Sequence, residues 1–265
     1  MQLWIGTSGF QYAEWKGTFY PETLSTAKML PYYAERFPAT EINYTFRQIP
    51  STKTMERWSS LTPEGFRFSL KAPQKVTHFA RLRDCADTLR YFHQVTSQLG
   101  SKLGPVLFQL PPAFTKDTPR LAAFLDEVPN GMRAAFEFRH TSWFDDEIFA
   151  LLRQWNAALC IADSESLATP LVATADFGYL RLRREDYHIS DLVEWAATIG
   201  AKGPEWRETF IFFKHEESGV GPKFAAEMQR LLAPWSQSAR EPSAGAAPYC
   251  ARRSGDAFLL ERHCV

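Results

Sequence analysis

The chain has 265 residues, with 30 lysines and arginines balanced by 30 aspartates and glutamates, so its formal net charge at pH 7 is zero. A hydrophobic content of 45% and a charged content of 23% are typical of a globular chain that can bury its own core. The neutral balance excludes a general attraction to nucleic acids or anionic membranes, and only local basic patches remain as a basis for binding polyanions.

Short segments rich in β-branched and aromatic residues alternate along the chain with segments of helical periodicity. The expected strands lie at residues 3–7, 40–45, 66–71, 106–110, 134–138, 158–162, 179–183 and 210–214. The expected helices lie at residues 26–37, 51–60, 84–99, 119–127, 143–155, 191–199 and 223–232. Ser142 and Ser190 are expected to cap two of these helices, and the stretch 164–174 is expected to hold little helix.

The alternation of eight strands with helices predicts an α/β fold, a single (β/α)8 TIM barrel over residues 1–235 with an irregular sixth helix. An open, doubly wound sheet is the alternative. However, the turn after the first strand (GTSGF, residues 6–10) lacks the GxGxxG pattern that such sheets use to bind phosphates. Residues 236–245 are small, polar and aperiodic, and we expect a flexible, disordered tail over residues 236–265.

The motifs do not predict a disulfide-bonded, metal-binding, cofactor-binding or membrane protein. Cys85, Cys160, Cys250 and Cys264 form no CxxC pair, so reduced thiols are expected rather than disulfides or a zinc site. No histidine and carboxylate pattern predicts a metal site, and no phosphate loop or other cofactor motif occurs, so neither a metal nor a cofactor is expected. No apolar run approaches the roughly 20 residues that span a bilayer, so we expect a cytoplasmic protein without membrane contact.

Polar residues gather where the expected strands end. In a TIM barrel the active site lies at the carboxyl ends of the strands. Side chains alternate along a strand, so Glu137 and Arg139 should point into the barrel mouth while Phe136 and Phe138 face the helices. We expect six side chains to converge on this mouth, namely Lys71, Gln109, Glu137, Arg139, Asp163 and Arg181.

Roles follow from the chemistry of these side chains. Lys71 and Arg139 are suited to hold an anion or polarise a carbonyl group, and Arg139 should lower the pKa of Glu137. The candidate catalytic residues are Glu137, Lys71, Asp163 and His140. The candidate substrate-binding residues are Thr7, Ser8, Tyr12, Trp15, Asn43, His78, Gln109, Arg139 and Arg181. The alternative is that the charged residues form structural ion pairs that close the barrel.

Five aromatic residues and Lys16 lie within residues 10–20, in the loop after the first strand. Such a loop is suited to stack the face of a sugar or a base beside the mouth. The alternative is a packed lid over the barrel.

The order of these motifs resembles a known family. The motifs are GTSGF at residues 6–10, EIN at 41–43, KAP at 71–73, LFQLPP at 107–112 and EFRH at 137–140. Together they resemble the YecE-like family, the domain of unknown function 72, over roughly residues 3–233. The resemblance implies a TIM barrel and adds no mechanism.

Three functions remain open. The first is an enzyme, a hydrolase, isomerase or lyase without a dedicated metal, acting on a small phosphorylated or sugar-like substrate at the barrel mouth. The second is a nucleic-acid-binding or processing protein. The third is a barrel that binds a metabolite as a sensor and catalyses no reaction. In the first case Glu137→Gln is expected to abolish turnover and leave folding intact.

Overall fold

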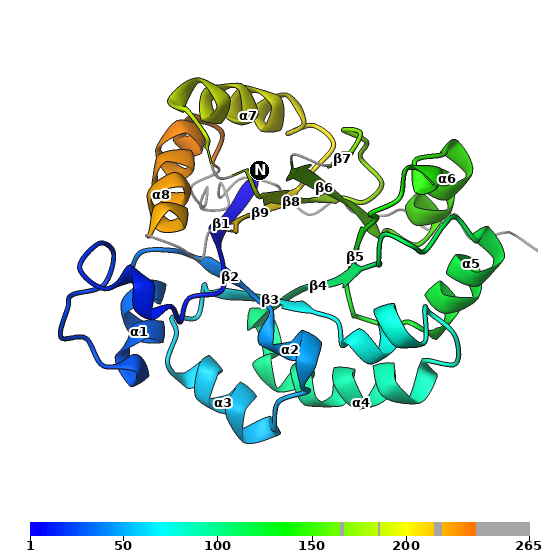
Figure 1. The fold of residues 1–265 in the computed structure, drawn as a ribbon, viewed down its shortest axis with the longest axis horizontal. Coiled ribbons are helices and arrows are strands. Elements are labelled where there is room, and N and C mark those ends of the chain that lie inside the picture. Colours follow the sequence, from blue (N-terminus) through cyan, green and yellow to red (C-terminus); the bar gives the residue numbers. More distant parts are fainter. Residues whose placement is uncertain (165–166, 185, 215–218, 237–265) are drawn as a thin grey trace, which may run out of the picture.

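The computed structural model describes residues 1–164, 167–184, 186–214 and 219–236, and shows a closed barrel of parallel strands ringed by helices (Figure 1). Strands β1 and β9 pair and close the barrel, and β5 pairs with β6. All eight expected strands are confirmed, as is the TIM-barrel fold. They are β1 (Gln2–Ser8), β2 (Ala39–Ile42), β3 (Arg67–Lys71), β4 (Leu103–Gln109), β5 (Ala134–Glu137), β6 (Ala158–Ser164), β8 (Phe177–Leu182) and β9 (Glu208–Phe213).

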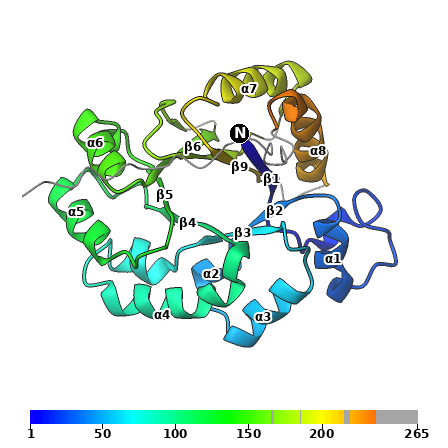
Figure 2. The same cartoon turned by 180° about the vertical axis from the view of Figure 1, so that it is seen from behind.

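The helices form an outer ring, seen from the opposite side in Figure 2. They are α1 (Met29–Ala34), α2 (Tyr44–Arg47), α3 (Thr52–Ser60), α4 (Ala86–Thr96), α5 (Thr118–Glu127), α6 (Asp146–Gln154), α7 (Ile189–Ala201) and α8 (Val220–Leu232). Within the described residues, no helix combines the length and the apolar character that crossing a membrane requires.

The predicted helix caps were wrong at two positions. Asp145, not Ser142, caps α6, because its carboxylate accepts from the backbone N–H of Glu147 at 2.9 Å and suits the positive end of the helix. Ser142 instead lies in a short 3-10 turn, where its Oγ accepts from the backbone N–H of Lys116. Helix α7 begins before Ser190, with His188 at the N-cap position.

The connection between β6 and β8 differs from the other connections of the barrel. Its described residues contain no helix, as expected from the sequence, and hold instead the short strand β7 (Leu167–Ala168), which pairs antiparallel with β6. The expected tail lies outside the described residues from position 237 onward.

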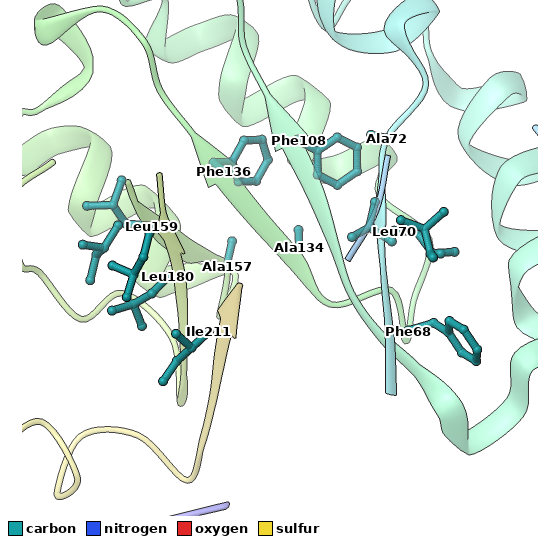
Figure 3. Close-up of a cluster of buried hydrophobic side chains, with 14 of the residues drawn as sticks. Phe68, Leu70, Ala72, Phe108, Ala134, Phe136, Ala157, Leu159, Leu180 and Ile211 are labelled. Carbon is teal, nitrogen blue, oxygen red and sulfur yellow. The ribbon is translucent and has the colours of Figure 1, made fainter. Parts of the chain in front are cut away.

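Apolar side chains fill the layer between the barrel and the helices. Phe108 of β4 and Phe136 of β5 lie side by side in Figure 3, with ring centroids 5.3 Å apart. Both pack against Phe124 of α5. The outward orientation expected for Phe136 and Phe138 is therefore confirmed, and it turns the alternate residues of β5 into the barrel.

The barrel interior has a second apolar cluster, which occupies its middle. Its members are Trp4, Ala39, Leu107, Ala135, Ala158, Cys160, Phe177, Tyr179, Phe210 and Phe212. At the amino end Glu208 accepts from Trp4 Nε1 at 2.7 Å and pairs with Arg133 at 3.0 Å, so polar side chains close that end. The middle and the amino end of the barrel are thus filled by side chains, so we expect a ligand site at the carboxyl end. Cys160 in this cluster and Cys85 are buried free thiols, while Cys250 and Cys264 lie outside the described residues.

Candidate active site at the carboxyl end of the barrel

Arg181 of β8 occupies the centre of the barrel mouth and is only 2% exposed. Its Nη1 donates to Glu137 Oε2 at 2.5 Å and its Nη2 to Glu41 Oε1 at 2.9 Å. The other oxygen of Glu41 accepts from the hydroxyl of Tyr179 at 2.7 Å, and Ser8 Oγ donates to Oε1. One guanidinium therefore ties two buried carboxylates together, which offsets part of the cost of burying all three charges.

Glu137, 1% exposed, is the most heavily paired carboxylate of the mouth. Its Oε1 accepts from Gln109 Nε2 at 2.8 Å and from Arg139 Nε at 3.0 Å, and it lies 3.5 Å from Arg183 Nη1. Burial alone would raise the pKa of Glu137, but Arg181, Arg139, Arg183 and the Gln109 amide outweigh it and hold this pKa far below its usual range. The expected lowering is confirmed, and Glu137 is unsuited to act as a general acid near neutral pH.

Lys71 ends β3 at the rim of the mouth. Its Nζ donates to Gln109 Oε1 at 2.8 Å and lies 4.1 Å from the ring centroid of Phe46. Burial and the nearby charge of Arg181 lower the pKa of Lys71 to about 8. Burial and, after it, the charge of Lys71 lower the pKa of His78, whose ring packs edge-on against Phe46 with centroids 4.9 Å apart. Lys71 is thus the group of the mouth best suited to exchange a proton near neutral pH.

A pocket of about 720 Å³ opens beside this cluster and is lined by Glu137, Arg139, His140 and Arg183, among others. The side chains of Arg139 and Arg183 are 32% and 21% exposed, so both guanidinium groups reach the pocket while contacting the same carboxylate oxygen. His140 Nδ1 accepts from the backbone N–H of Ser142 at 3.2 Å. A neutral His140 therefore carries its proton on Nε2, available as a donor.

The structure brings five of the six side chains that were expected to converge into one hydrogen-bonded cluster, which we call the mouth cluster. The contacts of Ser8, Asn43, Glu41, Tyr179 and Arg183 extend it. The five expected members are Lys71, Gln109, Glu137, Arg139 and Arg181.

Asp163 does not belong to the mouth cluster, and the expectation that it converges there was wrong. Its Oδ2 accepts from Tyr187 at 2.7 Å and from Trp195 Nε1 at 3.1 Å, in a separate hollow of about 350 Å³ beside α7. Its neighbour Ala162 lines the mouth pocket, so alternation along β6 turns Asp163 to the other side of the barrel wall.

Two residues expected to bind substrate are structural. Thr7 is 1% exposed and faces α1, where its backbone N–H donates to the hydroxyl of Tyr33 at 2.7 Å. Trp15 is fully buried against Tyr12 and Tyr20, with ring centroids 4.7 and 6.1 Å away, so it offers no ring face to a ligand. The loop's later aromatic residues pack against α1, where Phe19 lies 5.7 Å from Tyr32 and 6.1 Å from Tyr33 between ring centroids. The start of the loop, residues 9–12, lines a cavity of about 590 Å³ beside the mouth.

Three members of the mouth cluster were not among the candidate site residues, namely Glu41, Tyr179 and Arg183. Alternation along β8 places Tyr179 and Arg183 on the same side as Arg181, and this signal was available in the sequence. Glu41 could be found by the same argument, because it lies two residues before Asn43. Within the described residues, no group of three histidines, cysteines or carboxylates is placed to hold a metal ion.

Comparison with known proteins places the chain in a family. The family described as "Protein of unknown function DUF72" matches residues 4–247. The UPF0759 protein YecE of Escherichia coli (strain K12) is 34% identical over 113 residues, and the match covers 42% of this chain and 42% of YecE. The UPF0759 protein YunF of Bacillus subtilis (strain 168) is 26% identical over 234 residues, which cover 81% of this chain and 79% of YunF.

Solved structures agree with this assignment. A DUF72 family protein from Thermotoga maritima MSB8 superposes with a TM-score of 0.79 at 25% identity, over 88% of this chain and 100% of that protein. A DUF72 family protein from Enterococcus faecalis V583, 17% identical, gives a TM-score of 0.75 over 88% and 96% of the two chains and so shares the fold. The chain, with its TIM barrel and its charged mouth, therefore belongs to the DUF72 family.

Proposed function

We propose that the mouth cluster is the catalytic site of an enzyme that acts on a small anionic, hydroxylated molecule of the phosphorylated or sugar-like kind. One observation carries the proposal: the cluster contains four cationic side chains and only two carboxylates. The cations are Lys71, Arg139, Arg181 and Arg183. In a partly buried site this excess positive charge favours an anionic ligand.

Arg139 and Arg183 are the groups that would hold the anion. Both share Glu137 Oε1, at 3.0 and 3.5 Å, and both line the same pocket. Planar guanidinium groups suit phosphate and carboxylate because they donate two parallel hydrogen bonds. Both Nη atoms of Arg181 donate to buried carboxylates, so this residue positions Glu41 and Glu137 rather than the anion.

Lys71 is the proposed proton carrier. Its pKa of about 8 provides both protonation states near neutrality, and Gln109 orients its ammonium group. Glu137 stays ionised and aligns the two arginines, while His140 Nε2 is placed to donate a hydrogen bond to a substrate hydroxyl or carbonyl at the pocket wall.

The binding step is tested with inorganic phosphate, ribose 5-phosphate and glucose 6-phosphate against the free sugars, by thermal shift and calorimetry. Phosphorylated ligands should raise the Tm, and Arg139→Gln and Arg183→Gln should each weaken binding by about tenfold or more. Arg207→Gln, at a side chain 86% exposed, is the matched control and should bind as the unaltered protein does. Equal binding by all three variants overturns the proposal.

The chemical step is tested by following the same ligands with ³¹P and ¹H NMR. Conversion that Lys71→Met abolishes supports catalysis at the mouth. A ligand that raises the Tm and is recovered unaltered favours the metabolite-sensing alternative. Salt-sensitive binding of oligonucleotides, without binding of sugar phosphates, favours the nucleic-acid alternative. Either of the last two results overturns the enzyme proposal.

A further inference from the structure

A second cavity, of about 590 Å³, lies beside the mouth between the loop after β1, the segment after β2 and helix α3. We call it the β1–β2 cavity. It is chemically unlike the mouth pocket, because no lysine, arginine, aspartate or glutamate of the described part of the chain lines it. The side chains that matter for its chemistry are Tyr12, Asn43, Tyr44, Gln48, Thr54 and Trp58.

The cavity combines aromatic faces with neutral polar groups. Trp58 is fixed from behind by stacking on Phe68, with ring centroids 5.8 Å apart and planes 20° apart. Tyr44 is 53% exposed at the rim, and its hydroxyl donates to Gln48 Oε1 at 3.0 Å. Aromatic faces suit the C–H face of a sugar ring, and amides and hydroxyls suit its hydroxyl groups.

The hydrogen bonds of Asn43 indicate that this cavity binds a ligand. Ser8 Oγ has one proton, which it donates to the Glu41 carboxylate, so it can only accept from its other neighbours. The amide nitrogen of Asn43 must therefore be the atom that faces Ser8, at 2.9 Å, which fixes the orientation of the amide. The remaining atom, Asn43 Oδ1, is buried and has no hydrogen-bond partner among the residues that the structure describes. A buried acceptor of this kind favours a ligand that donates to it.

We propose that the β1–β2 cavity binds a neutral sugar ring, with one ring hydroxyl donating to Asn43 Oδ1 and the ring packed against the aromatic wall. The contact from Asn43 through Ser8 to Arg181 links this cavity to the mouth cluster, with Ser8 Oγ 3.4 Å from Arg181 Nη2. The uncharged lining distinguishes this site from the anion-binding arginines, so the inference stands whether or not the mouth binds a phosphate.

The test is saturation-transfer NMR with neutral methyl glycosides of glucose, galactose, mannose and xylose, and with adenosine and uridine as the competing class of ring. Glycosides should receive saturation from the protein. Tyr44→Ala should weaken their binding by about tenfold, the effect of one lost aromatic contact. Tyr91→Ala, at a tyrosine 56% exposed on α4, is the matched control and should change nothing.

A further variant separates the two sites. Arg183→Gln should weaken phosphate binding by about tenfold or more and leave glycoside binding intact, so either proposal can fail without the other. Three results overturn the sugar site: no saturation of any glycoside, equal saturation in Tyr44→Ala, or stronger saturation of the nucleosides than of the glycosides. Since Tyr44 is exposed at the rim, its replacement should leave the fold unchanged, which circular dichroism checks.

Discussion

Arg181 and Glu137 form an ion pair across the barrel mouth in which the two side chains are 2% and 1% exposed, with Nη1 and Oε2 2.5 Å apart. They stand on different strands, 44 residues apart in sequence, and the same guanidinium also binds Glu41. Buried ion pairs of this kind contribute little net free energy when intact, but removal of one partner leaves an uncompensated charge. The mouth is therefore sensitive to single substitutions.

Arg181→Met tests this sensitivity. The variant leaves Glu41 and Glu137 buried without their shared cation, so the free energy of unfolding should fall by about 3–5 kcal/mol. Urea unfolding followed by circular dichroism measures the change. Arg207→Met, at an exposed arginine, should change stability by less than about 0.5 kcal/mol. A loss of under about 1 kcal/mol for Arg181→Met contradicts the central role of this residue.

Glu137→Gln should destabilise the fold, contrary to the expectation drawn from the sequence, because three arginines lose the charged carboxylate that they share. The pKa of Glu137 in the folded protein lies below its ordinary value of 4.5, so the folded state binds fewer protons in acid. Its contribution to stability is complete above pH 4.5 and is lost as the pH falls below that value. Thermal unfolding between about pH 6 and pH 3 should therefore show a steeper loss for the unaltered protein than for Glu137→Gln. Parallel pH profiles argue against an ionised Glu137.

Lys71 should titrate near neutrality. Because its pKa is lowered from 10.5 to about 8, the unfolded state binds more protons between these values, and stability should rise with pH across that window. Lys71→Met should remove the rise. Competitive acylation followed by peptide mass spectrometry should give a reactivity midpoint near pH 8 for Lys71. A midpoint for Lys71 near the ordinary lysine value of 10.5 contradicts the proposed proton carrier.

Trp15→Ala should act on stability and not on ligand affinity. The ring is fully buried among aromatic side chains, so its removal leaves a cavity and should cost about 3–5 kcal/mol. Trp155→Ala, at a tryptophan 40% exposed, is the control and should cost less than about 1.5 kcal/mol. Chemical unfolding of both variants measures the difference. Loss of ligand binding with unchanged stability restores the stacking role first expected for this loop.

The fold and the location of the site were readable from the sequence because both depend on local patterns. Alternating strand and helix segments predict the barrel, and the EFRH motif at residues 137–140 places Glu137 and Arg139 on one side of β5. The helix caps were harder to predict from the sequence. Asp145 and Ser142 are both good capping residues, and only the geometry of the chain selects between them.

The orientation of strand β6 was decided only by the tertiary structure. Strands of a parallel barrel are buried on both faces, so Cys160 and Ile161 of β6 are both apolar and do not show which one faces inward. This ambiguity explains why Asp163 was misplaced: the strand puts Ala162 at the mouth and Asp163 toward α7.

The sequence by itself determined a charged mouth at the carboxyl ends of eight strands, since strand order and side-chain alternation are local properties. Only the tertiary structure decided which charges meet. Arg181 binds Glu41, 140 residues away along the chain, because barrel closure brings β8 and β2 to the same interior layer. The tertiary structure also buries Asn43 Oδ1 without a hydrogen-bond partner among the described residues, a feature that no local pattern in the sequence reveals.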